Sequence, residues 1–277
     1  MNLVKNRKIG VIGTGSMGTA LVNAWVESGS VPPGNIFVHN RTQRKQEKLA
    51  QQFGVVAAKN NEEIIQNCDA IFFCVKPQDF FEMLHPISRL IRPEQIILSL
   101  AAGIHLKTLQ KWLPDVNNLV RVMPNTPIRI RKGVIGFCLG SKAAAVEPSV
   151  RDLLSPLGLV VPVQEGDEFE ALTVVCASGT GFVLELMSYW QDWLEEHGFS
   201  SGDARRIVTQ TFLGTAYLAA SDEGHTFVDL IESVASKKGV TQAGLESMRE
   251  MEVETHLRIS FEKAVLRDRE LGQAFKG

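Results

Sequence analysis

The stretch Gly10-Val11-Ile12-Gly13-Thr14-Gly15-Ser16-Met17-Gly18 decides the fold of the N-terminal half of the chain. It ends the apolar run 8–12, which predicts a short buried strand, and it opens the apolar-striped segment 17–27, which predicts a helix. Its glycines have the G-x-G-x-x-G spacing, in which Gly13 permits a tight turn, Gly15 lets a pyrophosphate approach the backbone, and Gly18 lets the helix pack on the strand. The free amides at the start of that helix are suited to phosphates. We therefore predict a dinucleotide site formed by Gly13, Thr14, Gly15, Ser16, Met17 and Gly18.

The composition is that of a soluble globular protein. The 277 residues, 44% of them hydrophobic, suffice for one large domain or two ordinary ones. The formal net charge of -2 gives no electrostatic reason to expect nucleic acid or an anionic membrane as a partner. We see no uninterrupted apolar run long enough to span a bilayer and no signal-peptide pattern, so we expect a cytoplasmic protein without membrane contact.

The cysteines and histidines predict neither a disulfide framework nor a metal site. The four cysteines, Cys68, Cys74, Cys138 and Cys176, are scattered without a CxxC pair, and most stand in apolar surroundings. The six histidines form no HxxxH or HExxH pattern. We expect buried free thiols and no bound metal.

Strand-like and helix-like segments alternate up to about residue 163, a pattern typical of a parallel sheet with crossover helices. Segment 35–39 is predicted as the second strand and 43–53 as the helix after it. An acidic residue after the second strand would bind the ribose 2′-hydroxyl of NAD, but Asn40-Arg41-Thr42 stands there. Because a guanidinium and hydroxyls suit a 2′-phosphate, we predict that Asn40, Arg41 and Thr42 bind the cofactor and that NADP(H) is favoured over NAD(H). Alternatively, Arg41 and Arg44 only form a solvated helix start.

Three more strands are predicted, and their carboxyl ends carry candidate binding residues. These strands are segments 70–75, 95–100 and 118–122, of which 70–75 is continuous in apolar residues, as a strand covered on both faces requires. Open α/β sheets bind ligands at the carboxyl edge. We assign the cofactor to Val75, Lys76 and Pro77 and to Ala101, Ala102 and Gly103, whose small size leaves room for a flat ring. The small residues are equally compatible with plain turn chemistry. We assign substrate binding to Met123, Pro124 and Asn125, a rigid turn with a polar amide.

Four motifs, in this order and at this spacing, resemble those of the pyrroline-5-carboxylate reductases: Gly13 to Met17, Val75-Lys76-Pro77-Gln78, Ser99-Leu100-Ala101-Ala102-Gly103, and Arg121-Val122-Met123-Pro124-Asn125-Thr126-Pro127. The last is the most diagnostic. The resemblance implies an α/β Rossmann domain with a doubly wound, mostly parallel sheet, and an NAD(P)H enzyme that reduces the cyclic imine 1-pyrroline-5-carboxylate to proline. It also implies that Asn61 contacts the cofactor ribose. From the residues alone, Asn61 is equally a helix N-cap ahead of Glu62 and Glu63.

The character of the chain changes near residues 163–166, where strand patterns stop. We predict a dinucleotide-binding domain at 1–163 and an all-helical domain at 164–277, with helices at 169–197, 202–223, 226–235 and two more from 241 onward. The first of these helices carries more apolar surface than one small domain can cover, so we expect a second chain to cover part of it. The resemblance agrees, because it implies a C-terminal dimerisation domain and a homodimer or a higher oligomer of dimers. The alternative is an ordinary intramolecular core.

The break between two of these helices, 233–241, is a candidate anion site. Free amides at a helix start, with nearby hydroxyls, hold a carboxylate without a cation. The resemblance places here a Ser-Pro-Gly-Gly-Thr-Thr type loop that binds the substrate. It implies substrate binding by Ser236, Gly239 and Val240, and a catalytic hydrogen bond from Thr241 to the imine nitrogen. A capping loop with two solvated lysines is the alternative.

The chain departs from the family pattern at two places. Lys237, Lys238 and Val240 differ from the common loop, and 177–182 replaces a proline and a tyrosine of the common Gly-Ser-Gly-Pro-Ala-Tyr. A loop with one glycine fewer is less free to take positive backbone dihedrals, and two lysines favour a different or additional anionic group. Substrate identity is therefore the open question: a different cyclic imine, or a non-catalytic NADP(H)-binding paralogue, are the alternatives.

Hydride transfer from the nicotinamide to the imine carbon is the mechanism that we expect. A protonated imine is already an electrophile, so no strong general acid is required and positioning supplies most of the acceleration. The β-hydroxyacid dehydrogenases share a similar glycine loop but carry a helical Gly-x-x-x-Lys-x-x-x-Asn motif. The corresponding segment, 179–185, has no lysine and no asparagine after it, which argues against that class.

Overall fold

The computed structural model describes residues 7–273. By packing, the chain forms two compact units: residues up to 180 together with those from 264 onward, and residues 181–263. The first unit thus includes the start of the helical segment and the end of the last helix. The boundary expected at 163/164 marks a change in sequence character and stays a prediction.

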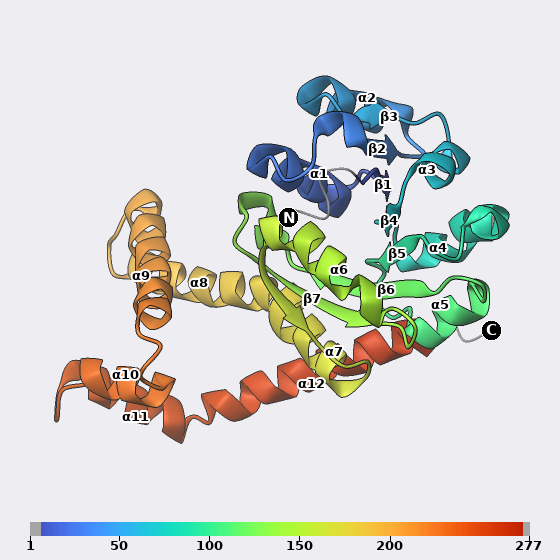
Figure 1. Cartoon of the computed structure of the whole chain (residues 1–277). Helices are drawn as coiled ribbons and strands as arrows, with labels where there is room; N and C mark the ends of the chain where they lie inside the picture. The colour runs from blue at the N-terminus through green and yellow to red at the C-terminus, as the bar shows by residue number, and fades with distance from the viewer. Residues whose placement is uncertain (1–6, 274–277) are drawn as a thin grey trace. The chain divides into compact units, whose positions relative to one another are not determined.

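Within residues 7–273, an eight-stranded sheet organises the first unit, in the order β3-β2-β1-β4-β5-β6-β7-β8 (Figure 1). All neighbours pair in parallel except β6 and β7. The strand order reverses at β1, which pairs with β2 on one side and β4 on the other, and this is where open α/β sheets bind nucleotides. The strands are β1 (Ile9–Ile12), β2 (Ile36–His39), β3 (Val56–Ala57), β4 (Ala70–Phe73), β5 (Ile96–Ser99), β6 (Asn118–Pro124), β7 (Gly133–Leu139) and β8 (Gly158–Pro162).

Helices cover both faces of the sheet, which explains why its strands are apolar throughout. One face packs against α1 (Ser16–Ser28), α2 (Gln43–Phe53) and α6 (Glu147–Leu154). The other packs against α3 (Asn61–Asn67), α4 (Pro77–Leu84) and α5 (Leu106–Trp112). The fully buried Trp25 anchors α1, since its indole donates to the carbonyl oxygen of Leu153 at 2.7 Å and its ring meets Phe72 edge-on. The doubly wound, mostly parallel α/β architecture is confirmed.

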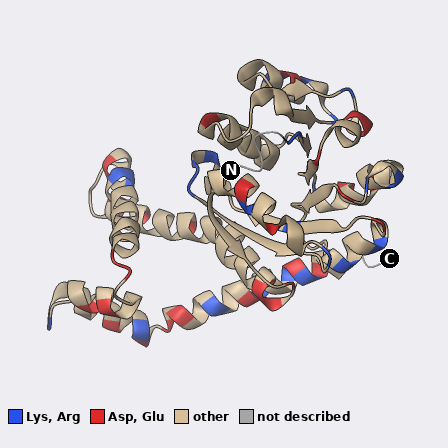
Figure 2. Ribbon diagram, in the orientation of Figure 1, with Lys and Arg blue, Asp and Glu red and all other residues tan. Residues whose placement is uncertain are grey.

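The second unit is helical, as predicted. A short helix α7 (Asp167–Leu172) and a π-helical stretch (Thr173–Ser178) lead without a break into α8 (Gly179–Glu196). Then come α9 (Ser201–Ser221), α10 (Phe227–Val234), α11 (Val240–Glu250) and α12 (Val253–Gln273), whose last residues belong to the first unit. Figure 2 shows few charged residues along α8 but both signs interspersed along α12.

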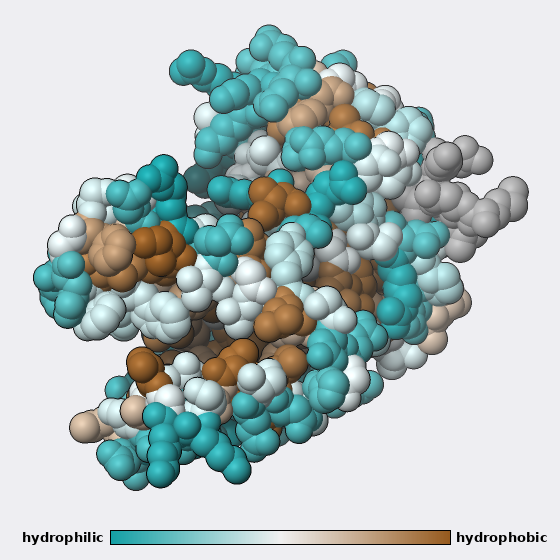
Figure 3. Space-filling view, turned by 90° about the vertical axis from the view of Figure 1, so that its left-hand side faces the viewer, coloured by the Kyte–Doolittle hydropathy of each residue, from teal (hydrophilic) through white to brown (hydrophobic). Residues whose placement is uncertain are grey.

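The helical unit has almost no core of its own. Of its hydrophobic residues, 181–263, only Ala204 and Val208 are buried. Apolar side chains instead reach the surface: Leu184 and Trp193 are each 59% exposed. Figure 3 shows brown, hydrophobic residues at the surface of the face that it draws. The alternative of an ordinary intramolecular core is therefore wrong for this segment as a single chain.

One helical stretch bears on the expectation about apolar runs. Within the described residues, Asp167–Glu196 is long and apolar enough to cross a membrane by length and composition, with 11% of its most apolar window buried. Charged residues such as Glu185 interrupt it, so it does not contradict the expectation that no uninterrupted apolar run is that long. Length and composition alone are weak evidence, and a helix face covered by another chain has the same composition.

Candidate functional site

The three glycines of the first loop have the geometry that their spacing predicts. Gly13 has a φ of 101°, and a Cβ there would lie 2.6 Å from the carbonyl oxygen of Cys74 at the end of β4. A Cβ on Gly18 would lie 2.1 Å from the carbonyl oxygen of Gly13. A Cβ on Gly15 would meet nothing within 4 Å, so this position faces open space, where a diphosphate can approach the backbone.

A cavity of about 640 Å³ lies at the carboxyl ends of β1, β2 and β4. Eight of the predicted cofactor residues line it: Gly13, Gly15, Asn40, Arg41, Thr42, Asn61, Val75 and Lys76. The structure therefore brings together three motifs that are far apart in the sequence. Of the other predicted residues, Thr14, Ser16, Met17, Gly18 and Pro77 belong to the loops and helix starts beside it.

The cavity wall also contains residues that were not predicted to bind the cofactor, including His39, Lys45 and Gln78. Arg41, Lys45 and Lys76 supply positive charge, whereas Asp79 and Glu82 line the same cavity from α4. α4 starts at Pro77, the last residue of the Val75-Lys76-Pro77 motif, and its residues Gln78, Asp79 and Glu82, at positions i, i+1 and i+4, could be assigned to the cavity only once the helix was placed.

Asn40 joins the second strand to the glycine loop. Its side-chain oxygen accepts from the backbone N–H of Thr14 at 3.0 Å, and its own N–H donates to Gln46 at 2.7 Å. Gln46 is buried and donates in turn to the carbonyl of Ala58. These hydrogen bonds fix the position of the loop after β2 relative to the glycine loop after β1.

Asn61 is not a helix cap. The N-cap of α3 is Asn60, whose side chain accepts from the N–H of Glu63 at 2.9 Å. Asn61 is the first helical residue, and its side-chain oxygen lies 2.6 Å from Nδ1 of His39 on the cavity wall. The capping alternative is thus wrong, while the ribose contact stays a prediction.

The small residues after β5 face the C-terminal end of the chain. Ala101 is buried, and Gly103 has a φ of 72° with its backbone against Gly272 of α12. A Cβ on Gly103 would lie 2.8 Å from the nitrogen of Gly272. Close packing therefore explains Gly103 in structural terms, and the cofactor role of Ala101, Ala102 and Gly103 stays a prediction.

Asn125 ties the Met-Pro-Asn turn to its neighbours. Its side-chain oxygen accepts from the N–H of Val134 at 2.9 Å, and its amide nitrogen donates to the carbonyl of Cys176 at 3.3 Å. Met123 and Asn125 are both buried. Through these contacts Asn125 links β7 to the π-helical stretch. They do not test its predicted contact with the substrate, which stays a prediction.

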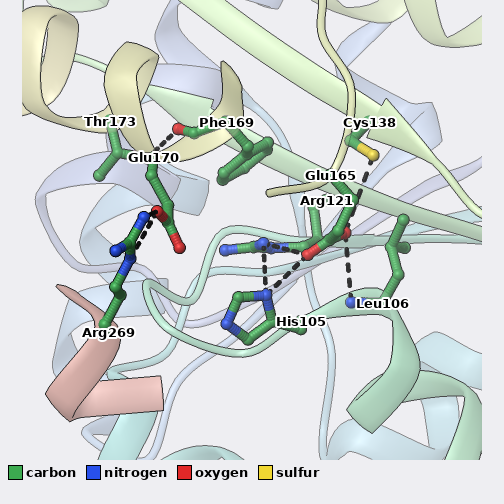
Figure 4. A network of polar contacts seen from close by, with 9 residues as sticks. All are labelled: His105, Leu106, Arg121, Cys138, Glu165, Phe169, Glu170, Thr173 and Arg269. Carbon is green, nitrogen blue, oxygen red and sulfur yellow. Dashed lines mark hydrogen bonds and ion pairs between the residues drawn. The ribbon is translucent and has the colours of Figure 1, made fainter. Parts of the chain in front are cut away.

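An ionic network around one buried arginine lies next to this turn (Figure 4). Arg121, 2% exposed on β6, pairs with Glu165 at 2.5 Å and lies over the ring of Phe169 at 3.9 Å. His105 contacts the same carboxylate at 2.9 Å. Burial alone would raise the pKa of Glu165, but the hydrogen bond from His105 and the nearby Arg121 outweigh it and hold this pKa below its ordinary value. In the sequence, the only indication of this network is an arginine within an otherwise apolar strand. Its partners could be identified only from the fold, because they are distant in the sequence.

The predicted substrate loop belongs to the second unit. Gly239 caps α11, and a Cβ there would lie 2.3 Å from the Ser236 hydroxyl oxygen. Lys238 has a φ of 59°, and its N–H donates to the side chain of Gln242 at 2.7 Å. Val240 is 95% exposed, and Thr241 follows it in the first turn of α11. The substrate and catalytic roles of this loop stay predictions.

All four cysteines are free; Cys68 and Cys138 are buried as predicted, whereas Cys74 and Cys176 are only half-buried. Burial raises the pKa of Cys68 to about 12 and that of Cys138 to about 11, and it also raises the pKa values of Cys74 and Cys176. Among the described residues, no group of three or more His, Cys, Asp or Glu side chains is placed to hold a metal ion.

Comparison with known proteins decides the family. The chain is 30% identical to the pyrroline-5-carboxylate reductase of Pseudomonas aeruginosa, over 96% of this chain and 97% of that protein. The chain belongs to the pyrroline-5-carboxylate reductase family. It is also 32% identical to pyrroline-5-carboxylate reductase 3 of Danio rerio, over 97% of this chain and 93% of that protein. Residues 8–103 match the family described as NADP oxidoreductase coenzyme F420-dependent, and residues 166–271 match pyrroline-5-carboxylate reductase dimerisation.

Solved structures of the family share this fold. A pyrroline-5-carboxylate reductase from Coxiella burnetii gives a TM-score of 0.89 at 26% identity, covering 96% of this chain and 99% of that one. The Plasmodium falciparum enzyme, solved with NADP bound, gives a TM-score of 0.86 at 22% identity, covering 97% and 99%. In this chain the open position at Gly15 and the buried hydroxyl of Thr14, which has no hydrogen-bond partner within residues 7–273, fit a bound dinucleotide.

Proposed function

We propose that this protein reduces 1-pyrroline-5-carboxylate to proline with NADPH as hydride donor. The single observation that carries the proposal is similarity to pyrroline-5-carboxylate reductases over nearly the whole length of both proteins. The open glycine loop and the cavity beside it support the cofactor part of the proposal. A different cyclic imine stays the second candidate, because Lys237 and Lys238 replace residues of the common substrate loop.

In this proposal, different residues of the chain bind the cofactor and the substrate. The amides at the start of α1 are free to hold the cofactor diphosphate, and Arg41 and Lys45 offer positive charge to a 2′-phosphate. Bound NADPH supplies a hydride from its nicotinamide. The amides at the start of α11 and the Ser236 hydroxyl are suited to the substrate carboxylate, and Thr241 to the imine nitrogen.

No general acid is needed in this proposal, because a protonated imine is already electrophilic. The high pKa values of Cys68 and Cys138 are consistent with a reaction that uses no thiolate. The acceleration then comes from holding imine and nicotinamide together, which is worth up to roughly 7–11 kcal/mol in well-oriented intramolecular reactions.

The experiment is to mix the purified protein with NADPH and 1-pyrroline-5-carboxylate and to follow the absorbance of the reduced cofactor. Consumption of NADPH with formation of proline supports the proposal. Turnover with a six-membered cyclic imine carboxylate, but not with 1-pyrroline-5-carboxylate, would support the second candidate. NADPH binding without turnover of either would indicate a non-catalytic paralogue.

We further propose a homodimer, or a higher oligomer of dimers, in the cytoplasm. The dimerisation-family match over 166–271 and the sparse core of 181–263 support the assembly. The absence of nucleic-acid and membrane partners stays a prediction.

A further inference from the structure

Arg129 is placed against the start of the helix that follows the glycine loop. It comes from a short 3₁₀ segment (Thr126–Ile130) after β6, 113 residues away from Ser16 in the sequence. Its guanidinium donates a hydrogen bond to the hydroxyl of Ser16, the first residue of α1. The sequence motifs assigned no function to this arginine.

Positive charge accumulates here without a counter-charge. The start of α1 carries the positive end of the helix dipole, and its first turn contains no acidic residue. Within residues 7–273, no carboxylate forms an ion pair with Arg129. A guanidinium beside a helix N-terminus therefore lacks the anion that would balance it.

Two further observations indicate that the missing anion is a ligand. The Thr14 side chain, 4% exposed in the same loop, has a hydroxyl with no hydrogen-bond partner among the described residues. A second cavity of about 400 Å³ is lined by Arg129, Ser16 and Thr19, and it shares Gly15 with the cofactor cavity. Open space thus reaches Arg129 at the glycine whose backbone a diphosphate would approach.

We propose that Arg129 is a further cofactor-binding residue, which clamps the diphosphate of NAD(P)H from the side opposite the Asn40–Thr42 loop. The planar guanidinium suits phosphate oxygens, since it offers paired donors in a fixed geometry. The proposal rests on the proposed function, because it takes the ligand of the glycine loop to be a dinucleotide.

The ligand group distinguishes Arg129 from Arg41. NADPH and NADH share the diphosphate and differ in the 2′-phosphate. Arg129 therefore strengthens the binding of both cofactors by the same factor and has no part in choosing between them. A contact of Arg41 with the 2′-phosphate would strengthen NADPH binding alone.

The test measures the Kd of NADPH and of NADH by titration calorimetry on the full-length wild type, Arg129→Gln and Lys132→Gln. Lys132 is an exposed cation in the same turn and serves as the matched control. We expect Arg129→Gln to weaken both cofactors by roughly 10- to 100-fold, as loss of a charged hydrogen bond does, with their ratio unchanged. Arg129→Lys restores part of the affinity, and Lys132→Gln leaves both Kd values near wild type.

The outcomes separate this inference from the proposed function. If wild type binds NADPH and Arg129→Gln binds it as well as Lys132→Gln does, the clamp is wrong while the proposed function stands. A change in the NADPH to NADH ratio at Arg129→Gln also overturns the clamp, because it assigns Arg129 to the 2′-phosphate. If wild type binds neither dinucleotide, both proposals fail. Unchanged circular dichroism of the variants shows that a loss of affinity is not a loss of fold.

Discussion

Lys238 occupies a backbone conformation that favours glycine. Its φ of 59° lies in the left-handed region, which costs a side-chain-bearing residue about 1–2 kcal/mol. The hydrogen bond from the Lys238 N–H to the side chain of Gln242 holds the turn in this conformation. The loop therefore keeps its shape at an energetic cost, which is a pattern found at functional sites.

Glycine substitution tests this strain with a matched neighbour. Lys238→Gly relieves the left-handed strain and loses about as much through the added freedom of the unfolded chain, so we expect the urea midpoint to stay near wild type. Lys237 does not have a positive φ, and Lys237→Gly should lower the free energy of unfolding by about 0.5–1 kcal/mol. Equal losses at both positions would contradict the strain at Lys238.

Thr241 carries the catalytic part of the proposed function. Thr241→Ala should lower kcat for imine reduction well beyond any change in the Kd of NADPH, because it removes the hydroxyl that orients the imine nitrogen. Thr241→Ser keeps the hydroxyl and should retain most of the activity. Steady-state kinetics with direct cofactor binding measure both. Unchanged turnover in Thr241→Ala would show that the assignment is wrong.

Arg41 is the residue expected to choose the cofactor. It lines the cofactor cavity, whereas Arg44, one turn further into α2, does not. Arg41→Gln should weaken NADPH by roughly 10-fold or more and leave NADH unchanged, because only NADPH has the 2′-phosphate. Arg44→Gln is the matched control and should leave the ratio of the two Kd values at wild type. An effect of similar size at Arg44 would favour a solvated helix start.

The site residues differ in how far sequence alone could reach them. Gly13 and Gly18 were predictable, because their spacing encodes local geometry that needs no knowledge of distant parts. Asn60 and Asn61 show that sequence patterns are imprecise even over short distances. A shift of one residue decides which of the two side chains caps α3 and which contacts His39. The contact of Arg129 with Ser16 was beyond reach, because no local pattern relates residues 113 apart.

At the scale of the element, the end of α12 brings an acidic residue into the charged network of the sheet unit. Asp268 is 7% exposed. Burial raises its pKa, nearby Glu170 raises it further, and Arg121 and His105 partly offset the rise. Arg269, the next residue, pairs with Glu170 at 2.6 Å. The ion pair between Arg269 and Glu170 thus stabilises the packing of the end of α12, whereas the buried charge of Asp268 destabilises it.

The raised pKa of Asp268 determines how its contribution to the free energy of unfolding changes with pH. A raised pKa in the folded state contributes stability below the ordinary aspartate pKa, and this contribution is lost as pH rises through the folded value. We therefore expect Asp268→Asn to stabilise the protein at neutral pH, within the roughly 0.5–3 kcal/mol common for single substitutions. The difference should shrink as pH falls, measured by urea unfolding across pH.

Glu165 provides a control of opposite sign. Its lowered pKa means that its contribution is present above the ordinary glutamate pKa and is lost as pH falls. Glu165→Gln should therefore destabilise the protein at neutral pH and less so in acid. If Asp268→Asn followed the same course as Glu165→Gln, the carboxylate of Asp268 would be favourable and the argument from burial would be wrong.

The elements predicted correctly are those whose pattern is self-contained. The five strands predicted from apolar runs are present as β1, β2, β4, β5 and β6. The missed strands are β7, which pairs antiparallel with β6, and the two edge strands of the sheet, β8 and the two-residue β3. Alternation of strand and helix predicts parallel neighbours only, so the return strand β7 fell outside that pattern.

At the scale of the whole molecule, the helical unit is the part whose apolar side chains a single chain leaves mostly uncovered. Residues 181–263 bury only two hydrophobic side chains and expose Trp190 and Trp193, at 51% and 59%. Covering the exposed parts of such side chains recovers a part of the roughly 1.5–3 kcal/mol that complete burial of a large apolar side chain contributes, so cover by a second copy is favourable. A helix pair from another chain would also account for the apolar length of Asp167–Glu196 without a membrane.

The final prediction is that the exposed face of α8 holds the oligomer together. Analytical ultracentrifugation of wild type should show a dimer or a larger assembly at micromolar concentration. Trp193→Glu places a charge on that face, and we expect it to shift the equilibrium toward monomer by at least 10-fold in Kd, since burying an unpaired carboxylate is costly. Leu90→Glu, at a 45% exposed apolar residue of the sheet unit, is the matched control and should leave the assembly intact. A wild type that stays monomeric, or equal effects of the two substitutions, would show that the α8 face is covered by something other than a second copy.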